Sequence, residues 1–257
     1  MVTLPEIGPA GGARGLLADI EAALAGHLPG FRQGLAVADD PRPSLPRDLL
    51  LAPDMIARIA ARFEARYGPT DPRAILSIWT SWHFGTVLPP VLAAGILFDL
   101  GPVLDFEAAR FIMAPDLRTE AVTIGEGTVR LDRGNAFARF EPLVDAYLRP
   151  AIRFFASRGG LSERVLWSNA GTAFEALLCR MEALAGDRDG YRAARRFLDG
   201  PSLPDGAPNP LYRPVRYVEG RRIRRVCCVR FLVPDGQICA ACPLDPTHPA
   251  RRPHDTP

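Results

Sequence analysis

The sequence predicts an α+β fold that is mostly α-helical, with a small central antiparallel strand region and a C-terminal module rich in cysteine. Three observations support this fold class. Apolar residues recur at helical spacing along most of the chain, apolar and polar residues alternate between 103 and 131, and four of the five cysteines fall between Cys227 and Cys242. With 257 residues, of which 47% are hydrophobic, the chain is long enough for one large domain or two small ones.

The N-terminal quarter contains two expected helices. Residues 16–27 indicate a first amphipathic helix, and the prolines at positions 41, 43 and 46 mark the loop that follows it. The pattern predicts a second helix over 53–67, because proline suits a first helical turn and Gly68-Pro69 provides the stop signal. Three apolar side chains share one face of this helix, namely those of Ile56, Ile59 and Phe63.

Residues 74–98 carry no formally charged side chain, which gives this stretch the length of a membrane span. Pro89-Pro90 stands within it, and polar residues interrupt its first half. Two adjacent prolines break a helix, so we expect two short buried helices that meet at a corner and no transmembrane span. In the strand region that follows, Gly125-Glu126-Gly127 predicts a hairpin turn between residues 122–124 and 129–131.

Helical patterns resume in the C-terminal half, over 142–157 with a kink near Pro150, over 162–185 with Ser162 as the expected cap, and then as far as Leu198. The predicted organisation is a mainly helical, substrate-facing body at 1–200, a proline-rich connector at 201–214, a cysteine module at 215–244 and a flexible tail at 245–257. His248 and His254 belong to that tail, where solvated side chains are the simpler expectation.

Composition excludes several kinds of chemistry. All 31 basic residues are arginine, and without lysine the chain has no P-loop lysine and no Schiff-base lysine for pyridoxal phosphate. It also has no G-x-G-x-x-G sequence, so a redox reaction would draw its electrons from another protein or a diffusible donor. Residues 1–15 lack the basic and apolar regions of a signal peptide. We therefore expect a cytoplasmic protein with reduced thiols.

The pattern Cys227-Cys228-x10-Cys239-x2-Cys242 predicts a metal site, since soft thiolates favour zinc, copper(I) or iron–sulfur iron. Two adjacent cysteines can hardly both bind one tetrahedral ion without strain, whereas a [2Fe-2S] centre spreads four thiolates over two irons. An iron–sulfur cluster is the better fit, with structural zinc and a disulfide or vicinal redox pair as alternatives. Cys179 lies in an apolar helical pattern and is expected to be a small buried side chain outside the site.

With its lead-in, the pattern Arg224-Arg225-x-Cys227-Cys228-x10-Cys239-x2-Cys242 resembles the signature of ferric-siderophore reductases of the FhuF (ferric hydroxamate reductase) type. Further blocks look like family blocks in the family's order, namely Ser77-Ile78-Trp79-x2-Trp82 running to Leu88-Pro89-Pro90, Leu166-Trp167-Ser168-Asn169, and Asn209-Pro210-Leu211. The resemblance covers residues 70–243. The cysteine doublet with its spacing is highly specific, and the tryptophan blocks are supportive.

The resemblance implies a cytoplasmic oxidoreductase whose [2Fe-2S] cluster is held by Cys227, Cys228, Cys239 and Cys242. Such a protein passes one electron to iron(III) in an imported siderophore, of hydroxamate type, and releases iron(II) for iron assimilation. The electron comes from an external donor, a ferredoxin-like protein or an NAD(P)H-dependent reductase. No catalytic side chain beyond the cluster is implied, no nucleic acid is expected as a partner, and peripheral contact with the inner membrane stays open.

The candidate substrate-binding residues are aromatic and polar side chains of the family blocks together with the two arginines before the doublet, namely Trp79, Trp82, His83, Trp167, Asn169, Arg224 and Arg225. Core packing is the competing interpretation of the tryptophans and the histidine. Seven arginines between positions 213 and 230 accompany a single acid, Glu219. They either raise the potential of the cluster and attract an acidic donor or an anionic ferric complex, or they form a solvated basic face.

Two other functional classes compete with the reductase. The first is a zinc-stabilised module whose arginines contact nucleic acid, and the second is an iron–sulfur electron carrier or sensor that never meets a siderophore.

Overall fold

The computed structural model describes residues 12–25, 27–28, 34–234 and 238–244, so the tail with His248 and His254 lies outside the described residues. Helices dominate the fold, as predicted. They are α1 (Gly12–Ala25), α2 (Pro53–Tyr67), α3 (Pro72–Leu97), α4 (Ala136–Pro142), α5 (Arg149–Gly159), α6 (Glu163–Ala185) and α7 (Asp189–Asp199), with short helical turns η2 (Arg47–Leu49), η3 (Leu143–Leu148) and η4 (Arg230–Leu232). Within the described residues, no helix is long and apolar enough to cross a membrane.

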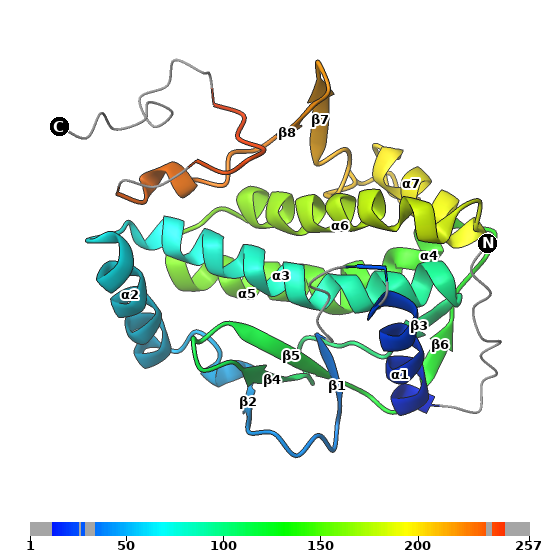
Figure 1. Ribbon diagram of the computed structural model, residues 1–257, viewed down its shortest axis with the longest axis horizontal. Coiled ribbons are helices and arrows are strands. Elements are labelled where there is room, and N and C mark those ends of the chain that lie inside the picture. Colours follow the sequence, from blue (N-terminus) through cyan, green and yellow to red (C-terminus); the bar gives the residue numbers. More distant parts are fainter. Residues whose placement is uncertain (1–11, 26, 29–33, 235–237, 245–257) are drawn as a thin grey trace.

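Helix α3 forms the centre of the molecule, with α6 along one side, α5 beside it and a sheet across the other side (Figure 1). Its side chains are buried on nearly all faces, which explains why the sequence of this helix is almost uniformly apolar. The short turn η4 of the cysteine module also packs against α3. The same helix therefore contacts the core, the sheet and the cysteine module.

Helix α3 continues through Pro89 and Pro90, so the expected corner between two short helices is wrong. Each proline removes one backbone donor and costs a helix interior about 3 kcal/mol. Dense packing of α3 against α5, α6 and β5 offsets that cost. The carbonyl groups of Gly85 and Thr86 lose their normal partners, because residues 89 and 90 have no N–H to donate.

The strands form three small sheets that agree with the predicted α+β class. The largest has the order β1 (Leu35–Val37), β5 (Thr119–Ile124), β4 (Arg110–Met113), β2 (Ser44–Pro46). Its β2–β4 and β4–β5 pairs are antiparallel, as expected for this region, whereas β1 joins β5 in parallel. The other two sheets are the antiparallel pairs β3 (Leu100–Pro102) with β6 (Thr128–Arg130), and β7 (Val215–Val218) with β8 (Arg221–Arg224).

The predicted hairpin at Gly125-Glu126-Gly127 is wrong in its pairing. A turn does occur there, with Gly127 at φ +83°, but β6 pairs with β3 instead of β5. The Gly125 N–H donates to the Val103 carbonyl at 2.8 Å, which directs the chain away from β5. The local signal located the turn, and tertiary packing chose the partner strand.

The helices of the C-terminal half lie close to their expected positions. A π-helical turn, η3, precedes Arg149-Pro150, where the sequence predicts a kink. Ser162 occupies the N-cap position of α6, although its side chain makes no capping hydrogen bond. The connector at 201–214 is fastened by Asn209, whose Nδ2 donates to the carbonyls of Phe197 and Gly200 at 2.8 and 2.9 Å. The division into body, connector, module and tail stays a prediction.

Candidate metal centre

The four clustered cysteines lie on a loop that leaves β8 and folds back beside it. Cys227 and Cys228 follow the strand directly, and the Arg224 N–H donates to the Ala241 carbonyl at 2.8 Å, which brings the second cysteine pair back to the first. The Cys242 N–H donates to the Cys239 carbonyl at 3.0 Å and closes a tight turn. Cys228 and Cys242 are buried, and Cys227 and Cys239 are half-buried.

Hydrogen bonds from α3 and α6 hold this loop in place. The Ser77 hydroxyl donates to the Cys228 carbonyl at 2.6 Å, and the Ser168 hydroxyl donates to the Val226 carbonyl at 3.4 Å. Asn169 links the two helices, because its Nδ2 donates to the Ser77 carbonyl at 3.0 Å and to Thr80 Oγ1 at 3.1 Å. The residues of two blocks that are far apart in the sequence therefore meet beneath the cysteine loop.

Arg224 is a buried cation directly beside the thiols. One of its terminal nitrogens, Nη2, donates to Asn169 Oδ1 and to Ser168 Oγ, while the buried Nε has no hydrogen-bond partner among the described residues. Burial lowers the pKa of Arg224, and the nearby thiolates of Cys228, Cys239 and Cys227 oppose that shift. An unpaired buried donor is costly unless an acceptor meets it. The position is suited to a negatively charged group held by the cysteines.

The thiols themselves are electrostatically coupled. A hydrogen bond from Cys239 lowers the pKa of Cys228 to about 6, and the same hydrogen bond raises the pKa of Cys239. Burial raises the pKa of Cys227, whose sulfur also accepts the Val229 N–H at 3.4 Å. Within this hydrogen-bonded pair, Cys228 is thus the thiol that ionises more readily, and the charge of Arg224 also favours its thiolate.

The donor set fits a two-iron cluster better than a single ion. Cys227 and Cys228 are adjacent, so they can hardly both bind a single tetrahedral zinc without strain, whereas a [2Fe-2S] cluster takes two thiolates on each iron. Four soft ligands, a half-buried position and the unpaired Nε of Arg224 all agree with a cluster of this kind.

Several predicted substrate residues lie in the core. The Trp79 side chain is 2% exposed and donates to the Leu117 carbonyl at 2.9 Å, and His83 is fully buried between Thr119 Oγ1 and the Tyr147 hydroxyl, each at 2.8 Å. Burial lowers the pKa of His83 to about 3, so this histidine is neutral. Both side chains of α3 point into the core, so these positions argue against direct contact of Trp79 or His83 with a substrate.

The other candidates have different surroundings. Trp167 is buried beneath the guanidinium of Arg149, and Asn169 and Arg224 support the cysteine loop from inside. Arg225 is exposed, with its guanidinium over the Tyr212 ring. Trp82 is the one predicted tryptophan with a large exposed fraction, 38%.

Cys179 is exposed, so the expectation of a small buried side chain is wrong. It lies on the outer face of α6, where its Sγ donates to Glu175 Oε1 at 3.2 Å. The Tyr217 hydroxyl and Arg222 Nε also donate to the Glu175 carboxylate, each at 2.6 Å. This carboxylate fastens the β7–β8 hairpin to α6, and Cys179 stays apart from the cysteine loop.

Some of the seven arginines between positions 213 and 230 are neutralised by acidic side chains. Arg213 pairs with Asp199 at 2.9 Å and Arg222 pairs with Glu175, while Arg216 and Arg221 are exposed on the hairpin. Only Arg224 of this group is buried against the thiols. The seven arginines therefore have different surroundings, and their positions do not support one shared role.

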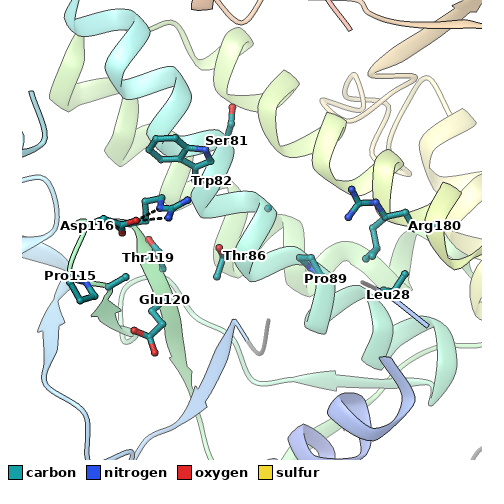
Figure 2. Close-up of a pocket in the computed structure, with 14 residues that line it drawn as sticks. Leu28, Ser81, Trp82, Thr86, Pro89, Pro115, Asp116, Thr119, Glu120 and Arg180 are labelled. Carbon is teal, nitrogen blue, oxygen red and sulfur yellow. Dashed lines mark hydrogen bonds and ion pairs between the residues drawn. The ribbon is translucent and has the colours of Figure 1, made fainter. Parts of the chain in front are cut away.

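A pocket of about 730 Å³ opens on the side of α3 that bears Trp82 (Figure 2). Its lining comes from α3, from the β4–β5 turn and from α6, with Leu28 at one edge: Leu28, Ser81, Trp82, Gly85, Thr86, Pro89, Ala114, Pro115, Asp116, Arg118, Thr119, Glu120, Leu177 and Arg180. Of these lining residues, only Trp82 is a candidate substrate residue from the sequence. The others share no sequence motif, because the pocket walls come from segments that are far apart in the chain.

The cysteine loop, its buried cation and the helical body beneath it together define an iron–sulfur protein. Residues 224–244 match the FhuF 2Fe-2S C-terminal domain, so the cofactor is a [2Fe-2S] cluster, as predicted. Residues 77–224 match the family described as ferric iron reductase FhuF-like transporter. Because this match covers more than half of the sequence, the chain belongs to the FhuF-like ferric iron reductase family.

A named relative supports the same assignment. The chain is 28% identical over 178 residues to a ferric siderophore reductase of Escherichia coli strain K12, a match that covers 68% of this chain and 67% of the relative. The family expected from the cysteine pattern and the upstream blocks is thereby confirmed.

Proposed function

We propose that this protein reduces iron(III) bound by a siderophore and so releases iron(II) in the cytoplasm for iron assimilation. The observation that carries the proposal is the family cysteine module, fastened through Ser77 to the same helix that lines a pocket of about 730 Å³. An iron–sulfur carrier or sensor has no need of such a pocket. The name of the Escherichia coli relative, a ferric siderophore reductase, points the same way.

We further propose that Cys227, Cys228, Cys239 and Cys242 hold the cluster. All four lie on one loop, where Cys239 and Cys228 share a hydrogen bond. Because two adjacent cysteines can hardly bind one tetrahedral ion without strain, Cys227 and Cys228 would bind different irons. When bound, the cluster supplies a one-electron donor. The guanidinium of Arg224 offsets the negative charge of the thiolates in a site that is largely shielded from water.

Reduction is a sufficient release step for this kind of substrate. Siderophore oxygen donors are hard ligands that hold iron(III) tightly, and they hold the softer, less charged iron(II) poorly. The reaction thus requires binding and electron supply, with no general acid or nucleophile from the chain. In the absence of a dinucleotide-binding sequence, the electron comes from an external donor, a ferredoxin-like protein or an NAD(P)H-dependent reductase.

The proposal is tested by assaying anaerobically purified protein for iron, acid-labile sulfide and ferric-siderophore reduction in parallel. Two variants accompany the wild type, Cys239→Ser in the module and Cys179→Ala on the exposed face of α6. Loss of the visible iron–sulfur spectrum and of reductase activity in the first variant only is the expected result. A colourless wild type, or full activity in Cys239→Ser, would overturn the proposal.

A further inference from the structure

The pocket beside Trp82 has an aromatic side chain, polar groups and, among the residues that the structure describes, an unpaired arginine in its lining. We propose that it binds the ferric siderophore, with Trp82 as an aromatic platform and Arg180 as the group that selects neutral or anionic complexes over cationic ones. This inference rests on the proposed function and adds the place of the substrate and its charge class. Figure 2 shows Trp82 and Arg180 on either side of Thr86 and Pro89.

The size and composition of the pocket suit a compact metal complex. Ligand pockets generally enclose about 300–1,000 Å³, and this one encloses about 730 Å³. Its lining mixes apolar groups with polar side chains from Ser81, Thr86 and Thr119. A siderophore complex presents hydrocarbon linkers together with polar oxygen and amide groups, so it needs contacts of both kinds.

Trp82 is held rigidly in the pocket wall. The Phe63 ring lies 5.6 Å from its ring, and the Arg118 guanidinium lies 5.1 Å from it. Arg118 is fixed in turn, because its Nε donates to Asp116 Oδ2 at 2.6 Å. A large ring that is already ordered loses little conformational entropy on binding, which makes the exposed part of Trp82 an efficient contact surface.

Four charged side chains line the pocket, namely Asp116, Arg118, Glu120 and Arg180. Asp116 pairs with Arg118, and Glu120 accepts a hydrogen bond at 2.7 Å from Arg42, which also pairs with Asp40. Arg180 is exposed on α6 and makes no hydrogen bond or ion pair with any residue that the structure describes. Arg180 is therefore the lining charge that is free to pair with a ligand, so a carboxylate or another anionic group of the bound complex finds a partner there, and an ammonium group at the same place is repelled.

The pocket also lies close to the cysteine loop. Ser81, in the pocket wall, donates to the Ser77 carbonyl at 2.8 Å, and the Ser77 hydroxyl donates to the Cys228 carbonyl at 2.6 Å. One helical turn, a rise of about 6 Å, separates the two serines on α3. A complex bound beside Ser81 therefore lies near the backbone that carries Cys228.

The test uses gallium(III) complexes, which match the charge of iron(III) complexes and are not reduced. A linear trihydroxamate chelator is prepared with its terminal amine free, acetylated or succinylated, which gives cationic, neutral and anionic complexes on one scaffold. Titration calorimetry of the cluster-loaded wild type should show the tightest binding for the anionic complex and the weakest for the cationic one. Arg180→Glu should weaken binding of the anionic complex roughly tenfold and strengthen that of the cationic complex, so that the order of affinities reverses.

The controls separate this inference from the proposed function. Arg153→Glu makes the same charge change at an exposed position on α5 and should leave all three affinities unchanged, whereas Trp82→Ala should weaken all three together. If Arg180→Glu and Trp82→Ala bind as the wild type does while the wild type still reduces ferric complexes, the pocket assignment is wrong and the function stands. If the variants behave as expected but reduced wild type releases no iron(II), the pocket stands and the proposed function fails.

Discussion

Replacing Asn169 by alanine should loosen the cysteine loop and destabilise the whole protein. The Asn169 side chain is 2% exposed and links α3 to Arg224, the cation beside the thiols. The substitution removes hydrogen bonds from Nδ2 to the Ser77 carbonyl and to Thr80 Oγ1, and it removes the acceptor for Arg224. Asn169 thus connects α3 with this arginine through hydrogen bonds of a single side chain.

The magnitude follows from the number and kind of these bonds. Two hydrogen bonds between neutral groups contribute about 1 kcal/mol each, and one from a buried guanidinium contributes about 1.5–3 kcal/mol. The expected loss of stability is roughly 3–5 kcal/mol, a large part of the 5–15 kcal/mol typical of a domain. For a chain of this size, that loss lowers the melting temperature by roughly 10 °C.

The assay compares Asn169→Ala with Asn135→Ala, which makes the same change at the exposed N-cap of α4. Loss of that cap costs about 1 kcal/mol and should not affect the cysteine loop. Thermal melting of the cluster-loaded proteins at one scan rate gives the stability, and the decay of visible absorbance after addition of an iron chelator gives the rate of cluster loss. Melting and decay curves for Asn169→Ala that match those of Asn135→Ala would refute the bridging role of Asn169.

Three further predictions concern other parts of the molecule. Cys239→Ser should lose the visible iron–sulfur spectrum, whereas Cys179→Ala should keep it. Visible absorbance together with iron and sulfide analysis measures this difference, and equal spectra would count against the four cysteines of the module as the cluster ligands. The pKa of His83 falls from 6.5 to about 3 on folding, so the unfolded state binds more protons between these values and stability decreases as pH falls through this window. Urea unfolding should show the wild type losing about 2 kcal/mol more than His83→Gln between pH 7 and pH 5, and equal losses would contradict a buried neutral histidine. Glu175→Gln should weaken the hydrogen bond that Arg222 of the β7–β8 hairpin donates to this side chain, and so loosen the hairpin. Amide hydrogen exchange in the hairpin should then become faster, and unchanged exchange would disprove the prediction.

The elements that the sequence predicted well have strong local signals. Helix α2 begins at Pro53 and ends at Tyr67 as expected, because proline at the first turn and Gly68 at the end define both limits. The family and the cofactor were predicted from the spacing of the cysteine module, since few functions require four thiolates in that arrangement. Trp82, a candidate substrate residue from its block, lines a pocket, and its contact with a substrate stays a prediction.

The errors arose where tertiary contacts outweigh local chemistry. Packing of α3 on several sides keeps it continuous through Pro89-Pro90, and β6 pairs with β3 although the turn before it favours a hairpin with β5. Cys179 has apolar neighbours along the chain, but its direction on α6 points it toward the hairpin. The position of Arg180 in a pocket wall could not be predicted from the sequence, because the other walls come from segments far away in the chain.

The most direct test of the central claim is a single-turnover experiment. Anaerobic protein is reduced, freed of excess reductant and mixed with a ferric trihydroxamate complex in the presence of a chromogenic iron(II) chelator. The oxidised visible spectrum and the iron(II) complex are followed together. We expect both to appear at the same rate, with about one iron(II) captured per chain, because a [2Fe-2S] centre gives up one electron. A reduced spectrum that persists in the presence of the ferric complex, or reoxidation without iron(II), would contradict it.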